Sequence, residues 1–152
     1  MSVTRREVLS SFSAAAVLGT VLPELLSAGV GQAQSEALPS AVYPFEKLPV
    51  RETKTGQFRS ILKGKLATGE AIEVHETTLT AGSAPHPPHH HEHSEMWLIR
   101  EGTLEINIGG KTQSISAGAA AFVRSNEEHG VKNLTDQPVT YFVVAVGPSA
   151  AK

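Results

Sequence analysis

The most informative segment of the chain reads Gly82-Ser-Ala-Pro-His-Pro-Pro-His89-His-His91-Glu-His-Ser-Glu95-Met-Trp-Leu-Ile-Arg-Glu-Gly102. Residues 86–95 contain five histidines and two glutamates, and a further histidine follows in His129-Gly-Val-Lys-Asn133. Imidazole nitrogens and carboxylate oxygens are ligands of divalent metals, and a patterned strand follows the cluster directly, unlike a histidine tag. The segment therefore predicts a metal site inside a folded domain.

The spacing within this segment favours three of its side chains as ligands. Three prolines between residues 85 and 88 favour extended backbone, which disfavours a helical pairing of histidines. Alternate residues of an extended chain share a face, so His89 and His91 can project together. Glu95 has the same parity on the strand that follows. We expect these three side chains to converge.

Short apolar runs separated by turn residues follow one another along the chain, as is typical of an antiparallel sandwich or barrel. Strands are predicted at Phe58–Leu62, Ala71–Thr78, Glu95–Arg100, Thr103–Ile108, Lys111–Ile115, Ala120–Val123, Gly130–Asn133 and Val139–Val146. Gly109-Gly110 predicts a two-residue hairpin, because glycine tolerates positive φ. The pattern predicts an all-β fold whose mouth is a ligand pocket.

The same residues carry a resemblance to the cupin superfamily. Its first motif is a glycine, a His-any-His pair, three or four residues, a glutamate, six residues and a glycine. His89, His91, Glu95 and Gly102 match this spacing. The leading Gly82 lies one residue further from the first histidine than the family pattern has it.

The second cupin motif is matched by Gly118, His129 and Asn133. Where the family has a proline and a glycine, this chain has Arg124 and Asn126. Asparagine accepts left-handed backbone almost as glycine does, so the turn before the histidine is still expected. The matched region resembles small single-domain bacterial cupins of the conserved-barrel kind.

The resemblance implies a single cupin jelly-roll β-barrel that binds one divalent metal through His89, His91, Glu95 and His129. Iron, manganese, nickel, cobalt and zinc all suit such a ligand set, which does not choose among them. Glu95 is also the one carboxylate placed for a catalytic role, as a proton shuttle.

Four other histidines have open roles. His86, His90 and His93 are expected to be solvated loop residues, and parity predicts that the last two point outward. His75 is expected to be structural or an outer hydrogen-bond partner of a metal ligand. In a shifted register, His91 and His93 would be the metal-binding pair. Glu95 would then follow the second histidine too closely to match the motif.

The strand that begins at Glu95 has two distinct faces. Trp97 and Ile99 share the parity of the glutamate and are expected to point into the barrel around the metal. Met96 and Leu98 have the opposite parity, so we expect them to form an apolar face on the outside of the barrel. A homodimer through this face is a hypothesis.

The first third of the chain differs from the rest. Arg5-Arg6 precedes the weakly apolar segment Ser11–Leu22. Together these two features resemble a twin-arginine signal peptide, which would cover residues 1–33. The apolar segment is well short of the roughly 20 residues that span a bilayer, so no permanent membrane anchor is expected. Cleavage is predicted after Ala33, with Ala28 as the alternative, and the mature protein is predicted to be periplasmic or secreted.

Residues 34–55 are predicted to form an extended arm, and residues 56–147 to form the single cupin domain. The formal charge of −2 leaves no basic face for nucleic acid. The chain has no cysteine, so any metal must bind nitrogen and oxygen ligands.

The favoured function is a mononuclear metal enzyme, dioxygenase-like or otherwise, that acts on a small organic substrate. One alternative is a non-catalytic protein that stores a metal or senses a small ligand. Another alternative is a structural role, in which the metal only closes the barrel.

Overall fold

The computed structural model describes residues 36–151, so the predicted signal peptide lies outside the described residues. The elements are the 3-10 helix η1 (Phe45–Lys47) and the strands β1 (Val50–Thr53), β2 (Gly56–Lys65), β3 (Ala71–Leu79), β4 (Ser94–Glu101), β5 (Thr103–Ile108), β6 (Lys111–Ser116), β7 (Ala120–Val123), β8 (His129–Lys132) and β9 (Val139–Val146). Within residues 36–151 there is no helix long and apolar enough to cross a bilayer.

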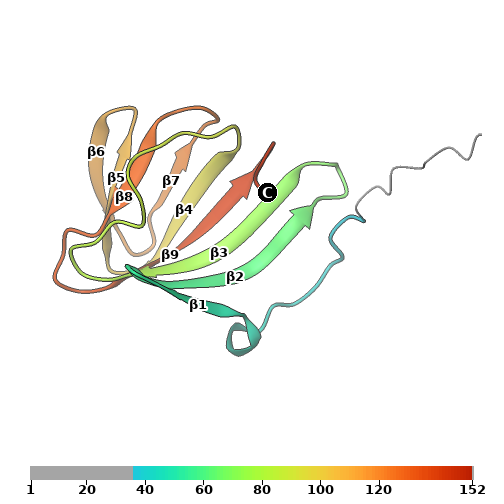
Figure 1. Cartoon of the computed structure of the whole chain (residues 1–152), viewed down its shortest axis with the longest axis horizontal. Coiled ribbons are helices and arrows are strands. Elements are labelled where there is room, and N and C mark those ends of the chain that lie inside the picture. The colour runs from blue at the N-terminus through green and yellow to red at the C-terminus, as the bar shows by residue number, and fades with distance from the viewer. Residues whose placement is uncertain (1–35, 152) are drawn as a thin grey trace, which may run out of the picture. The chain divides into compact units, whose positions relative to one another are not determined.

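The strands form two antiparallel sheets that face each other in a jelly-roll arrangement (Figure 1). The larger sheet has the order β1-β2-β3-β9-β4-β7, and the smaller has the order β6-β5-β8. The last strand of the chain thus lies between β3 and β4. The all-β prediction is confirmed, and each predicted strand overlaps a strand of the structure.

The alternation within β5 has the predicted consequence. Leu104 and Ile106 are buried in the core, whereas the side chains between them are more exposed. β5 turns directly into β6, with Ile108 opposite Lys111, because Gly109 and Gly110 adopt φ values of 55° and 78°. These positive φ values are the geometry of the tight hairpin that the Gly-Gly pair predicts.

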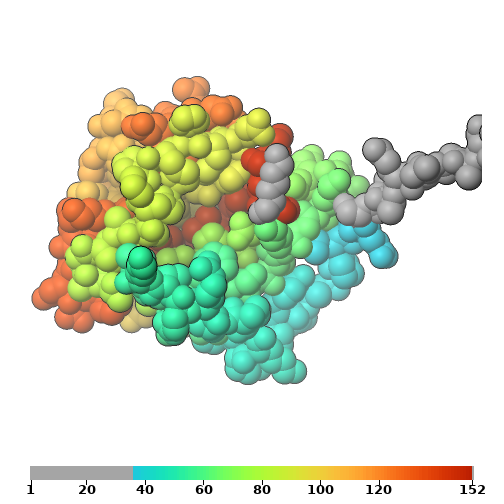
Figure 2. All heavy atoms as spheres, in the orientation of Figure 1, coloured from blue at the N-terminus to red at the C-terminus, as the bar shows by residue number. Residues whose placement is uncertain are grey.

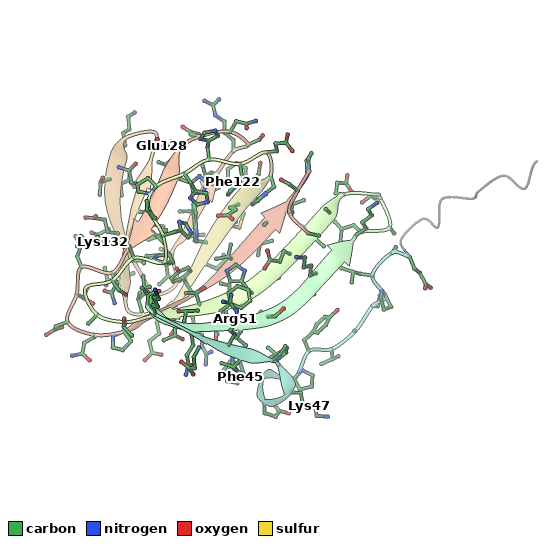
Figure 3. All side chains as sticks on the ribbon, in the orientation of Figure 1. Phe45, Lys47, Arg51, Phe122, Glu128 and Lys132 are labelled. Atoms are coloured by element: carbon green, nitrogen blue, oxygen red, sulfur yellow. The ribbon has the colours of Figure 1, made fainter. Side chains whose placement is uncertain are left out.

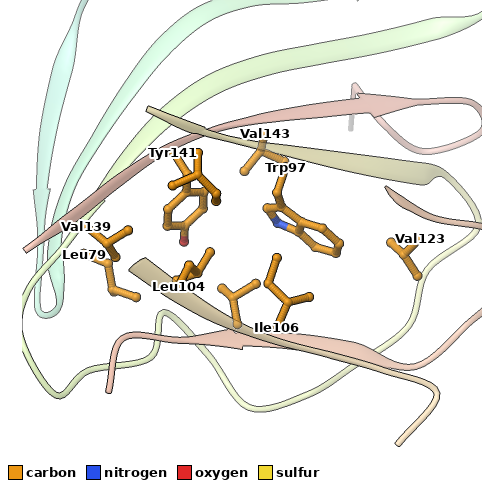
Figure 4. Close-up of a cluster of buried hydrophobic side chains, with 10 residues drawn as sticks. Leu79, Trp97, Leu104, Ile106, Val123, Val139, Tyr141 and Val143 are labelled. Atoms are coloured by element: carbon orange, nitrogen blue, oxygen red, sulfur yellow. The ribbon is translucent and has the colours of Figure 1, made fainter. Parts of the chain in front are cut away.

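The hydrophobic core lies between the two sheets. Figure 4 shows Trp97 and Tyr141 of the larger sheet beside Leu104 and Ile106 of the smaller one. Burying a large apolar side chain contributes about 1.5–3 kcal/mol relative to leaving it exposed, so these layers hold the sheets together.

The two faces of β4 are as parity predicts. Trp97 and Ile99 are 3% and 4% exposed, whereas Met96 and Leu98 are 38% and 39% exposed. Met96 lies opposite Phe122 of β7, which is also exposed, so the outer face is apolar here. The homodimer through this face stays a prediction.

The segment predicted as an extended arm contains a strand that the sequence analysis did not predict. β1 pairs with β2 from Val50 opposite Arg59 to Thr53 opposite Gly56. All its residues are exposed, so no apolar alternation marked it as a strand.

η1 packs against the outer face of the larger sheet. The Phe45 ring centroid lies 4.0 Å from the guanidinium carbon of Arg59 and 5.0 Å from that of Arg100. Both arginines pair with the buried Glu76 of β3, with nitrogen–oxygen distances of 3.6 Å and 2.6 Å. This cluster fastens the segment before β1 to the sheet.

Candidate metal centre

The backbone brings two predicted ligands side by side before any side chain is considered. His89 and His129 exchange two backbone hydrogen bonds, each 2.9 Å long, which pair the proline-rich loop with the start of β8. Gly130 allows this close approach, because a Cβ atom there would lie 3.2 Å from the Pro88 ring. A third bond, from the Asn126 amide to the His91 carbonyl at 2.8 Å, ties the next ligand to the β7–β8 turn.

Asn126 has a φ of 60°, which is the left-handed backbone expected where the family has glycine. The turn before His129 therefore forms despite the departure from the second cupin motif.

The four predicted residues come together at one point. The ring centroids of His89, His91 and His129 lie 4.6–5.2 Å apart. Glu95 projects from β4 into the same space, with one oxygen 3.3 Å from His91 Nε2 and the other 3.7 Å from His129 Nε2. The structure thus places the three rings next to one another and the carboxylate beside two of them.

Backbone carbonyls fix the tautomers of two of the imidazoles. The Nδ1 of His91 donates to the His93 carbonyl and the Nδ1 of His129 donates to the Glu127 carbonyl, each at 2.8 Å. Because a carbonyl only accepts, the proton sits on Nδ1 and the lone pair on Nε2. Such an arrangement is the usual outer support of a metal-binding histidine.

The nitrogens that remain are buried and have no partner. They are Nε2 of His91, Nε2 of His129 and Nδ1 of His89. A buried unsatisfied polar atom costs about 1–3 kcal/mol, and here two lone pairs also face the oxygens of Glu95. A cation among these four side chains would relieve both costs, so the residues fit a divalent metal.

His93 does not point outward as parity predicts. Its side chain is only 14% exposed, its ring stacks on His91 at 3.5 Å, and its Nε2 donates to a Glu95 oxygen at 3.3 Å. The chain bends at residues 92 and 93, which breaks the alternation before β4 begins at Ser94. His91, His93 and Glu95 thus form a second group that could hold a metal, besides His89, His91 and His129.

The other histidines differ in their surroundings. His90 is exposed, as predicted. His86 is exposed as well, but its ring meets the His89 ring edge-on at 4.3 Å. His75 projects from β3 into the barrel, where its Nδ1 lies 3.2 Å from Glu73.

A cavity of about 400 Å³ adjoins the cluster and opens to solvent. Its wall includes Glu95 and His129 together with the aromatic rings of Phe58, Trp97 and Tyr141. Figure 2 shows the hollow between the yellow-green loop that precedes β4 and the teal strands β1 and β2. A metal at the cluster would therefore face a space that a small molecule can enter.

Asn133 has a structural role that the motif alone did not reveal. Its side chain is fully buried and its amide donates to the carbonyls of Leu79, Thr80 and Gln137 at 2.8–3.2 Å. Its oxygen accepts from the backbone and hydroxyl of Thr135. Asn133 therefore joins the ends of β3 and β8 and does not reach the metal cluster.

Residues 75–145 match the family model described as the cupin domain. This part of the chain is therefore similar to a cupin domain. The cupin region has no match among the curated proteins. Its strands and histidine motifs nevertheless agree with the resemblance inferred from the sequence.

Solved structures share the cupin fold at low sequence identity. KdgF from Halomonas sp. has a TM-score of 0.60 at 15% identity, over 70% of this chain and 94% of its own. A predicted oxalate decarboxylase from Thermotoga maritima has a TM-score of 0.58 at 18% identity, over 70% and 99%. The polyketide cyclase RemF from Streptomyces resistomycificus has a TM-score of 0.56 at 20% identity, over 72% and 80%. At these identities the likeness shows the fold.

Burial lowers the pKa of two histidines in and beside the cluster. Burial, followed by repulsion from His86, His129 and His91, lowers the pKa of His89 to about 4. Burial also lowers the pKa of His93. The lone pair of His89 is therefore available at neutral pH, as a metal ligand requires.

This pKa predicts how the stability of the metal-free protein depends on pH. Between the ordinary value of 6.5 and about 4, the unfolded chain binds a proton that folded His89 does not. The free energy of unfolding should therefore fall as the pH is lowered through this range. Urea titrations in the presence of a chelator measure it, and His89→Gln should flatten the slope whereas the exposed-site control His90→Gln should not. Equal slopes in wild type and His89→Gln would contradict the assignment.

Proposed function

We propose that this cupin binds one divalent metal through His89, His91, Glu95 and His129 and presents it to a small organic molecule in the barrel cavity. The observation that carries the proposal is a group of three adjacent imidazoles with buried, unpartnered nitrogens, two of which face one carboxylate at the cavity wall. A cation that completes a buried group of this kind removes the cost of its unsatisfied nitrogens.

The ligand set suits iron, manganese, nickel, cobalt or zinc. A metal there would supply a Lewis acid or a redox centre to a small molecule in its open coordination positions. In metals that prefer octahedral geometry, the four side chains leave such positions free, and the cavity lies beside them. This favours an enzyme over a metal that only closes the barrel, since structural sites are closed.

We further propose that the enzyme is an oxidoreductase of the cupin dioxygenase type. Glu95 would then serve as ligand and as proton shuttle, because no other carboxylate within the described part of the chain lines the cavity. Non-catalytic binding of a metal or small ligand is the alternative. The similar structures include proteins of different activities, among them a polyketide cyclase and a predicted oxalate decarboxylase.

Metal content distinguishes the two possible ligand groups. The wild type should carry about one metal per chain, and His129→Ala should lose most of it, because His129 belongs only to the first group. His93→Ala should keep most of the metal, as should the exposed control His90→Ala. Elemental analysis after dialysis against limiting metal measures this. Loss in His93→Ala with retention in His129→Ala would assign the metal to the second group instead.

The same loaded proteins separate catalysis from binding. Oxygen consumption or conversion of small organic acids should disappear in Glu95→Gln, which keeps the shape but removes the charge and the proton transfer. A loaded wild type that binds such acids without turnover would leave the non-catalytic alternative.

We also propose that the protein is exported to the periplasm by the twin-arginine route, on the strength of Arg5-Arg6 and the short apolar segment after them. Replacement of both arginines by lysine keeps the positive charge but removes the arginine pair that the export pathway recognises. The variant precursor should therefore remain in the cytoplasm, as measured by cell fractionation and by the size of the chain. Normal export of the double-lysine precursor would contradict the proposed route.

A further inference from the structure

The rim of the cavity carries a cation that the proposed function does not use. Arg51 of β1 lies directly opposite Phe58 of β2, so both side chains project from the same face of the sheet. The Arg51 guanidinium carbon lies 5.0 Å from the centre of the Phe58 ring. Both residues line the same cavity as Glu95 and His129. Figure 3 labels Arg51 among the side chains.

Arg51 differs from the other arginines of residues 36–151 in having no carboxylate partner. Arg59 and Arg100 pair with Glu76, and Arg124 pairs with Glu127. The acidic neighbour of Arg51 in the sequence, Glu52, instead accepts a hydrogen bond from Gln57 at 2.9 Å. The Arg51 guanidinium is therefore free to pair with an anion that enters the cavity.

The rest of the lining indicates the shape of that anion. Phe58, Trp97 and Tyr141 give apolar walls to the cavity that Arg51, Glu95 and His129 also line. Its volume of about 400 Å³ is near the lower end for small-molecule sites. Among residues 36–151 no lysine lines it, so a single guanidinium supplies the fixed positive charge there.

We propose that the cavity takes a small organic carboxylate with an apolar body, and that Arg51 is the residue that selects it. The carboxylate pairs with the planar guanidinium, whose donors match its two oxygens. The body lies against the aromatic walls and the other end of the molecule reaches the metal cluster. This inference rests on the proposed function and adds the substrate class to it.

Two probes of the same shape and different charge test the role of Arg51. Benzoate carries the carboxylate and benzamide does not, and Trp97, the only tryptophan of the chain, reports binding by its fluorescence. Wild type should bind benzoate about tenfold or more tighter than benzamide, as a charged hydrogen-bonded pair implies. Arg51→Gln should abolish this preference and leave metal content unchanged, whereas Arg51→Lys should keep part of it.

Lys54→Gln is the matched control, because it removes one positive charge from the same hairpin at a position outside the cavity. It should retain the wild-type preference. The proposal is overturned if wild type fails to prefer benzoate, if Arg51→Gln binds benzoate as wild type does, or if Lys54→Gln loses the preference equally.

Titrations of metal-loaded and chelator-treated protein keep this inference apart from the proposed function. Arg51-dependent binding by a protein that takes up no metal would support the anion site and refute the metal site. If the protein carries its full metal content but benzoate binding does not depend on Arg51, the anion site alone would be refuted.

Discussion

The pair of backbone hydrogen bonds between His89 and His129 is the interaction on which the rest of the site depends. It holds a loop without regular structure against β8, so that histidines forty residues apart in sequence lie with their rings 4.7 Å apart. The prolines of that loop reduce the entropy it loses on ordering, and Gly130 leaves room for it. Backbone pairing thus brings the ligands together with or without a metal.

The sheets then determine what surrounds the cluster. Glu95 and Trp97 share one face of β4, so the strand that supplies the carboxylate also supplies an aromatic wall of the cavity. The opposite face of β3 carries Glu76, which is buried between Arg59 and Arg100. Glu76 is thus paired on the outer face and Glu95 lies at the cavity, while the core cluster between the sheets is made of apolar and aromatic side chains.

The extent to which sequence predicts this site follows from where the backbone is regular. Parity along β4 correctly predicts that Trp97 is buried and Met96 exposed, since a strand alternates throughout. It is wrong for His93, because a bend before the strand ends the alternation there. The sequence does not predict β1, because its exposed edge residues carry no apolar pattern. The position of Arg51 beside the cavity depends on the pairing of β1 with β2, which local sequence does not encode.

The central claim is that three imidazoles and one carboxylate hold a metal that stays open to the cavity. X-ray absorption spectroscopy of the metal-loaded protein tests it most directly, because scattering from imidazole rings is distinctive and solvent ligands respond to added anions. The account predicts a nitrogen and oxygen shell with three imidazoles, from His89, His91 and His129, and a spectrum that changes when azide is added. A shell with two imidazoles, as His91 and His93 would give, or a spectrum that azide leaves unchanged, would contradict it.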